Sequence, residues 1–231
     1  MTIEYNGQTK SSVSTSANPS YTHTVANARS GAVVWCVSAS DAASAPTAAT
    51  FDGVSCTPLA AGTITNTTGQ DLLVHGFFLG SGVSGSANAT VSVTWAGSDE
   101  KWCASHQFLA DSEAVIQDWN TKTQSSGTDM TVNLDFGGFE CIGLQCFCKG
   151  GYELPVANTD WGNNQNAVLI SSTARAGCHR YNAATDTTVG AGYNTTAEGS
   201  QEGVLITLAI REISASIIPQ RKDKFNHMLV R

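Results

Sequence analysis

Charged side chains are scarce in this chain. Asp, Glu, Lys and Arg make up 13% of its 231 residues, which is about half of the usual share of roughly 25%. The formal net charge is −7, and because the acidic body of the chain would repel a polyanion, we expect no binding to a nucleic acid. The surface must therefore consist mostly of Ser, Thr, Asn, Gly and Ala, as in an exposed β protein.

Signals for export and for membrane insertion are also missing. The first ten residues contain neither a basic n-region nor an apolar h-region, which a secretory signal needs. No apolar run approaches the roughly 20 residues of a membrane helix. We expect a protein that is made in the cytoplasm and does not span a bilayer.

Catalytic and metal-binding motifs are lacking as well. The chain has no G-x-S-x-G, H-E-x-x-H, P-loop or G-x-G-x-x-G motif. Cys178 and His179 are adjacent, and neighbours on a strand point to opposite faces, so they do not form a catalytic pair. Neither they nor Cys103-x2-His106 have the paired short spacings of a zinc site. We expect no enzymatic activity, no cofactor and no metal.

Seven cysteines are present, an odd number. In a reducing cytoplasm they are expected to be thiols that pack in the core. The run from Phe139 to Cys148 places Ile142, Leu144, Cys146 and Cys148 on one face of a strand.

What the chain does contain is a series of strand patterns separated by Gly and Asn turns, with almost no helical periodicity. Residues 32–37 and 72–79 are apolar on both faces, which indicates central strands. Residues 91–95 and 131–136 alternate apolar and polar, which indicates one wet face. Residues 204–210 form the last strong strand, with Val204, Ile206, Leu208 and Ile210 toward the core.

These patterns predict an all-β fold, a single antiparallel β-sandwich of jelly-roll type. A short helix within residues 108–119 is one further interpretation. No internal repeat is visible, and the weakest seam lies near residues 96–130. We expect an N-terminal arm over residues 1–18, the sandwich over residues 19–212, and a C-terminal arm over residues 213–231.

The C-terminal segment differs in charge from the body. Residues 211–231 carry five basic and two acidic residues, a net charge of +3, whereas the other 210 residues carry a net charge of −10. Pro219 interrupts any continuation of the last strand. Basic and apolar side chains beyond it are suited to docking on a neighbouring subunit, although a frayed terminus is the alternative. The candidate partner-binding residues are Arg221, Lys222, Lys224, Phe225, Met228 and Leu229.

Aromatic residues in Gly- and Asn-rich segments form a candidate glycan site, because a flat ring can stack on a sugar while polar neighbours bind its hydroxyls. In the alternative interpretation these rings cap the ends of the sandwich. The candidate glycan-binding residues are Tyr152, Asp160, Trp161, Asn163 and Tyr193.

Several segments, taken in order, resemble a β-sandwich family of tailed-bacteriophage virion proteins. They are Ser20–Val25 with Arg29, Gly31–Ser38, Ala49–Pro58, Leu73–Leu79, Ala87–Trp95 and Gly203–Glu212. The likeness covers roughly residues 19–212. One departure is Gly80–Ala87, which stands where a Pro-Pro-Ala-Gly turn is usual in the family.

The resemblance implies a structural protein of the virion without catalytic residues. The leading expectation is a capsid decoration (cement) protein that docks through its terminal arms on the major capsid protein or other virion subunits. It would be a homo-oligomer, with a trimer favoured. The alternatives are a tail fibre or baseplate appendage that binds host glycan, and a polysaccharide hydrolase.

Overall fold

The computed structural model describes residues 3–24, 30–40, 44–65, 70–83, 88–97, 99–151, 156–157, 161, 168–171, 174–194 and 199–213. These residues form only strands, turns and irregular segments, so the expected all-β fold is confirmed. Within these ranges no helix is long and apolar enough to cross a membrane.

Nine strands make up the first part of the chain. They are β1 (Glu4–Lys10), β2 (Ser20–Thr24), β3 (Ser30–Ser40), β4 (Ala48–Phe51), β5 (Val54–Ser55), β6 (Thr57–Thr65), β7 (Asp71–Val83), β8 (Asn88–Thr94) and β9 (Lys101–Leu109). Eight strands follow: β10 (Ala114–Gln124), β11 (Asp129–Asp135), β12 (Cys141–Gly150), β13 (Val156–Ala157), β14 (Val168–Ser171), β15 (Ala174–Ala184), β16 (Thr188–Asn194) and β17 (Gly203–Glu212).

The two sets of strands have the same topology. In the first set, a large sheet has the order β1-β9-β3-β7-β6 and a small sheet has the order β2-β8-β4-β5. In the second set, the orders are β10-β17-β12-β15-β14 and β11-β16-β13. In the first large sheet β9 lies between β1 and β3, and in the second large sheet β17 lies between β10 and β12. The last strand of each set therefore pairs with both the first and the third strand of that set. Each set is therefore an antiparallel sandwich with jelly-roll connectivity, and we call the two sets the first and second sandwich.

Even the irregularities of the large sheets recur. The pairing of β1 with β9 shifts between Tyr5 and Gly7, opposite Phe108. The pairing of β10 with β17 shifts between Ile116 and Asp118, opposite Ile210. A β-bulge bends its strand locally, so both sandwiches bend their first strand at corresponding places. The body is thus a tandem of two sandwiches joined at residues 110–113, inside the expected seam.

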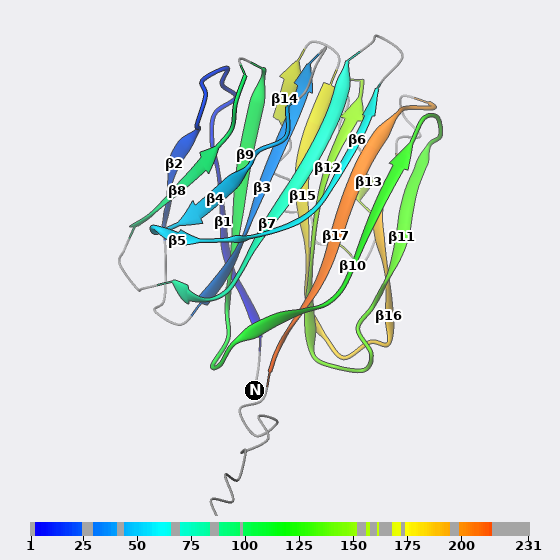
Figure 1. The fold of residues 1–231 in the computed structure, drawn as a ribbon. Helices are drawn as coiled ribbons and strands as arrows, with labels where there is room; N and C mark the ends of the chain where they lie inside the picture. The colour runs from blue at the N-terminus through cyan, green and yellow to red at the C-terminus, as the bar shows by residue number, and fades with distance from the viewer. Residues whose placement is uncertain are drawn as a thin grey trace, which may run out of the picture.

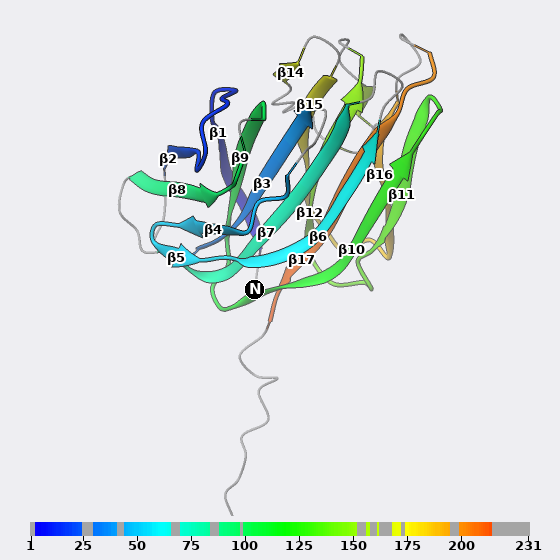
Figure 2. The same ribbon diagram turned by 45° about the horizontal axis from the view of Figure 1, so that its top comes forward.

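The two large sheets pack face to face, with one small sheet on each outer side (Figures 1 and 2). Val33, Trp35 and Val37 of β3 lie in the same central core as Cys146 and Cys148 of β12. Because each large sheet is covered on both faces, its central strands, such as β3 and β12, are buried on both faces. The predicted central strand over residues 32–37 is confirmed.

Each outer core lies between a large and a small sheet. In the first sandwich it contains Val34, Cys36, Phe51, Val91 and Trp95. In the second sandwich the corresponding apolar residues form two clusters. They are Leu134, Phe136, Cys141, Trp161, Val189, Ala191 and Ala209 in one cluster, and Met130, Phe147, Tyr193 and Leu205 in the other.

Three expectations from the sequence are corrected. The strands form two sandwiches of the same topology instead of the single sandwich that was expected, so the chain contains a structural repeat. Residues 4–10 form β1, the edge strand of the first large sheet, so this part of the predicted N-terminal arm belongs to the body. The interpretation of residues 108–119 as a helix is wrong, since they form the end of β9 and the start of β10. Backbone pairing of β10 along the whole of β17 outweighs the weak local helical pattern.

Candidate functional site

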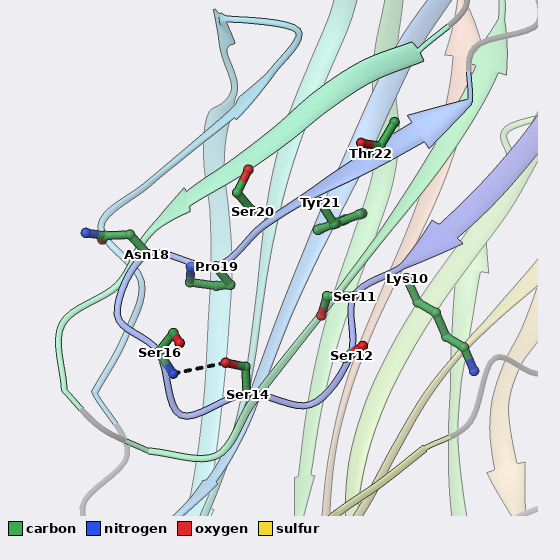
Figure 3. Close-up of a pocket in the computed structure, with 10 residues that line it drawn as sticks. All are labelled: Lys10, Ser11, Ser12, Ser14, Ser16, Asn18, Pro19, Ser20, Tyr21 and Thr22. Atoms are coloured by element: carbon green, nitrogen blue, oxygen red, sulfur yellow. Dashed lines mark hydrogen bonds between the residues drawn. The ribbon is translucent and has the colours of Figure 1, made fainter.

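A polar pocket of about 550 Å³ opens where the chain turns from β1 to β2. Figure 3 shows its lining side chains along one continuous segment. They are Lys10, Ser11, Ser12, Ser14, Ser16, Asn18, Pro19, Ser20, Tyr21 and Thr22. Its size is within the range of small-ligand sites, but its wall is richer in hydroxyl groups than most such sites.

The outward leg of this segment is held against β9. The backbone N–H of Ser11 donates to the carbonyl of Cys103 at 2.8 Å, and Oγ of Ser11 accepts the N–H of Cys103 at 3.0 Å. Ser14 and Lys101 exchange two backbone hydrogen bonds of 3.0 and 2.9 Å. This leg therefore extends the pairing of β1 beyond Lys10.

The return leg is held against β8 and its end. Asn18 adopts a φ of 55°, a conformation that Asn tolerates better than most residues, and its Oδ1 accepts the N–H of Trp95 at 3.0 Å. The carbonyl of Pro19 accepts the N–H of Val93 at 3.0 Å. Ser14 Oγ also accepts the N–H of Ser16 at 3.0 Å, which closes the turn between the legs. The pocket wall is thus fixed by backbone bonds together with the side chains of Ser11, Ser14 and Asn18. The hydroxyl groups of Ser12 and Ser16 belong to the lining and take no part in these bonds.

The chemistry of the lining favours binding over acid–base catalysis. Serine and threonine hydroxyls both donate and accept hydrogen bonds, and Lys10 adds one positive charge. Burial raises the pKa of Tyr21 well above its usual value, so this phenol stays protonated. The ten lining residues include no Asp, Glu or His. The pocket suits a small polyhydroxylated ligand, and an acidic group on that ligand would face Lys10.

The structure places two of the predicted glycan-binding residues in the interior. Trp161 is 1% exposed, and its Nε1 donates to the carbonyl of Gly190 at 2.7 Å. Tyr193 is 2% exposed within β16, its ring centroid lies 4.7 Å from that of Phe147, and burial raises its pKa. The expectation that these two rings lie exposed in loops is corrected. They fill the second outer core, so neither presents a face to a sugar.

The other predicted site residues lie outside the described residues. They are Tyr152, Asp160 and Asn163 of the candidate glycan site and Arg221, Lys222, Lys224, Phe225, Met228 and Leu229 of the candidate docking arm. Conversely, sequence reasoning missed the pocket. The run of serines from Ser11 to Ser16 was its only local signal.

The Cys–His pairs considered in the sequence do not converge. Cys103 belongs to the first outer core, whereas His106 accepts a bond from Trp35, a central-core residue. Cys178 belongs to the central core, whereas the ring of His179 contacts Phe147 on the other side of the sheet. The expectation that Cys178 and His179 point to opposite faces is confirmed. Across the described ranges, no three His, Cys, Asp or Glu side chains gather closely enough to hold a metal ion.

Comparison of the chain with protein-family models, curated proteins and solved structures finds no match.

Proposed function

We propose that this chain is a structural protein of a bacteriophage virion, a capsid decoration subunit that attaches through its C-terminal segment. The observation that carries the proposal is the position of the two ends of the body. Glu4 pairs with Leu109, and the N–H of Ile213 donates to the carbonyl of Glu113 at 2.9 Å. Both ends therefore border the short connection between the two sandwiches, and Figure 1 places them at the same end of the molecule.

This arrangement supports attachment by one pole. The segment after Ile213 is the part of the chain with a net positive charge, and it leaves from that pole. Ser112 holds the exit in place, because its N–H and Oγ both donate to Oε1 of Glu212 at 2.6 Å. In this arrangement the opposite end of the tandem would face solvent. A homo-oligomer, with a trimer favoured, is part of this proposal.

The direct test is binding to bare capsids of the phage whose genome encodes the chain. The full chain and a chain ended after Ile213 are compared by cosedimentation, and both are melted to check folding. We expect equal cooperative melts and capsid binding by the full chain alone. Binding of neither protein would contradict the decoration role, and equal binding of both would contradict attachment by the C-terminal segment. Light scattering of the unbound chain tests the trimer.

A second candidate function, a tail appendage that binds host glycan, is favoured by the pocket between β1 and β2. The variants Lys10→Gln and Ser12→Val change its lining, whereas Thr90→Val changes an exposed residue of β8 outside the pocket. On a glycan array, this role predicts binding by the unmodified chain and by Thr90→Val, with loss in both pocket variants. Absence of binding by the unmodified chain would exclude this role for the glycans on the array. A hydrolase role gains no support from the pocket, since its lining offers no carboxylate pair.

A further inference from the structure

Four of the seven cysteines form two cross-strand pairs. In the first sandwich, Cys36 of β3 lies directly opposite Cys103 of β9. In the second sandwich, Cys146 of β12 lies directly opposite Cys178 of β15. All four side chains are 0% exposed. Each sandwich therefore carries one pair of facing cysteines in the middle of its large sheet.

The geometry of an antiparallel sheet brings such pairs close together. Directly opposite residues point to the same face, with Cβ atoms about 4.5 to 5.5 Å apart. The thiol of Cys103 lies close enough to Cys36 to add to the effect of burial in raising its pKa, and the thiol of Cys178 acts on Cys146 in the same way. A disulfide needs a Cβ separation of roughly 3.5 to 4.5 Å. The two strands of each pair have to approach only slightly for a bond to form.

The other three cysteines have no such partner. Cys141 lies opposite Ala184 and Arg211, and Cys148 lies opposite Ala176 and Val204. Their thiols contact carbonyl oxygens, Cys141 that of Phe136 at 3.8 Å and Cys148 that of Ser38 at 3.9 Å. Cys56 contacts the carbonyl of Val54 at 4.0 Å. These three residues are internal controls for any reaction that needs two facing thiols.

We propose that the pairs Cys36–Cys103 and Cys146–Cys178 are two redox sites, each of which closes to a cross-strand disulfide in oxidising surroundings. The oxidant is a low-molecular-weight disulfide such as oxidised glutathione. One thiolate of the pair attacks the disulfide and releases one glutathione thiolate. The second cysteine then attacks the mixed disulfide and releases the other. Each pair loses two electrons and two protons, and two molecules of reduced glutathione form.

The surroundings of the pairs determine how the reaction proceeds. The thiolate is the attacking species, and burial raises the pKa of both Cys36 and Cys146. Oxidation of the folded chain is therefore slow, and closure is fastest while the sheets are forming or locally open. Because the two strands must come closer together than their normal spacing, the disulfide bonds are strained and are readily reduced. This inference does not depend on the proposed function.

The test allows the thiols to react before they are buried. The full chain is unfolded under reducing conditions and refolded in a glutathione redox buffer, and free thiols are then alkylated and located by peptide mass mapping. We expect alkylation at Cys56, Cys141 and Cys148 only, with links joining Cys36 to Cys103 and Cys146 to Cys178. A mild reductant should restore alkylation at all seven cysteines. Seven alkylated thiols after refolding, or links between other cysteines, would overturn the proposal.

Variants and a native sample keep the result interpretable. Cys36→Ala should remove one link and retain the other, Cys178→Ala should do the reverse, and Cys56→Ala should retain both. The native chain, held in the same buffer without unfolding, should reach the same two links more slowly. A sample refolded without oxidant, with a cooperative melt, controls for refolding itself. If that control fails, the native sample alone decides, and seven free thiols after prolonged incubation contradict the proposal.

Discussion

The indole Nε1 of Trp35 donates a hydrogen bond of 3.2 Å to Nδ1 of His106. An indole N–H can only donate, so Nδ1 of His106 carries no proton. The other ring nitrogen, Nε2, lies 2.9 Å from Oε1 of Gln8 and donates to it. The hydrogen bonds thus hold His106 neutral, inside a sheet where it is fully buried.

His179 is held neutral in the same way in the second sandwich. Oε1 of Gln145 accepts the N–H of Gly192 at 2.8 Å, which turns Nε2 of Gln145 toward the carbonyl of Gly192 at 3.1 Å. That amide nitrogen also lies 2.6 Å from Nδ1 of His179 and donates to it. Protonation of either histidine would place two N–H groups against each other.

We predict that stability falls as the solution becomes acidic. Burial lowers the pKa of His106 to about 3 and that of His179 to about 4, whereas unfolded histidine has a pKa of about 6.5. For His106 the neighbouring His23, His179 and Arg180 lower the pKa further. The unfolded chain therefore takes up protons first, so stability is full above about pH 6.5 and declines toward pH 4. Each of the two histidines contributes a loss of about 3 kcal/mol by pH 4.

Urea unfolding at a series of pH values measures this loss. Carboxylates also titrate near pH 4, so the difference between the unmodified chain and His106→Gln isolates one histidine. The slope of stability against pH should be shallower in His106→Gln. Identical slopes in the two proteins would contradict the role of His106.

We predict that Gly192→Ala destabilises the chain by more than about 2 kcal/mol. Gly192 has a φ of +135°, and a Cβ built there would lie 2.0 Å from the carbonyl oxygen of Met130. The same substitution would disturb the bonds of Gln145 that hold His179. Gly7→Ala is the matched control, because a Cβ at Gly7 meets no atom within 4 Å. Denaturant midpoints should separate the two variants clearly, and equal midpoints would refute the close approach.

We predict that Trp161→Ala lowers stability by about 3 to 5 kcal/mol. The ring fills the second outer core, and its Nε1 bonds the carbonyl of Gly190. Trp119→Ala removes a ring of the same size that is 52% exposed, and it should change stability by less than about 1 kcal/mol. Thermal melts of both variants provide the comparison. A larger loss of stability in Trp119→Ala than in Trp161→Ala would contradict the burial of Trp161 in the second outer core.

We predict that apolar contacts contribute more than charge to attachment by the C-terminal segment. Single surface charges such as Lys222 contribute about 0 to 1 kcal/mol, whereas Phe225 would contribute roughly 1.5 to 3 kcal/mol if covered by a partner. Phe225→Ala should therefore weaken capsid binding more than Lys222→Ala, and added salt should weaken binding only in part. The reverse order of the two variants, in the same cosedimentation assay, would contradict apolar anchoring.

The strands were predictable from the sequence because their signal is local. Successive side chains of a strand point to opposite faces, so the apolar residues at both odd and even positions of 32–37 and 72–79 predict burial on both faces without reference to any partner. The same local rule predicts that the side chains of Cys178 and His179, which are adjacent in the sequence, point to opposite faces of the sheet. All-β class, antiparallel pairing and the main strands follow from such patterns.

The tandem of two sandwiches became visible only in the tertiary structure. The pairing of β3 with β7 shifts just before Ala32, and the pairing of β12 with β15 shifts just before Gly143, so these two residues hold equivalent positions. Three residues further along each strand, Trp35 faces Gly76 in the first sandwich, whereas Cys146 faces Cys178 in the second. The topology repeats while the residues differ, because a core requires only that facing side chains together fill the space between sheets. A comparison of residue identities therefore cannot detect the repeat.

Burial of individual side chains also depended on distant partners. Trp161 and Tyr193 lie in parts of the sequence that are rich in turn residues, yet both are buried. The ring of Trp161 packs against Gly143, and the hydroxyl of Tyr193 packs against Gly203, where the absence of a Cβ leaves room for it. Cys36 meets Cys103 across 67 positions of the sequence through the register of β3 with β9. The sequence by itself determined the all-β class, several of the strands and which of their faces are apolar. Which faces and thiols meet was decided by strand register and sheet stacking, since these are set by packing across the whole body.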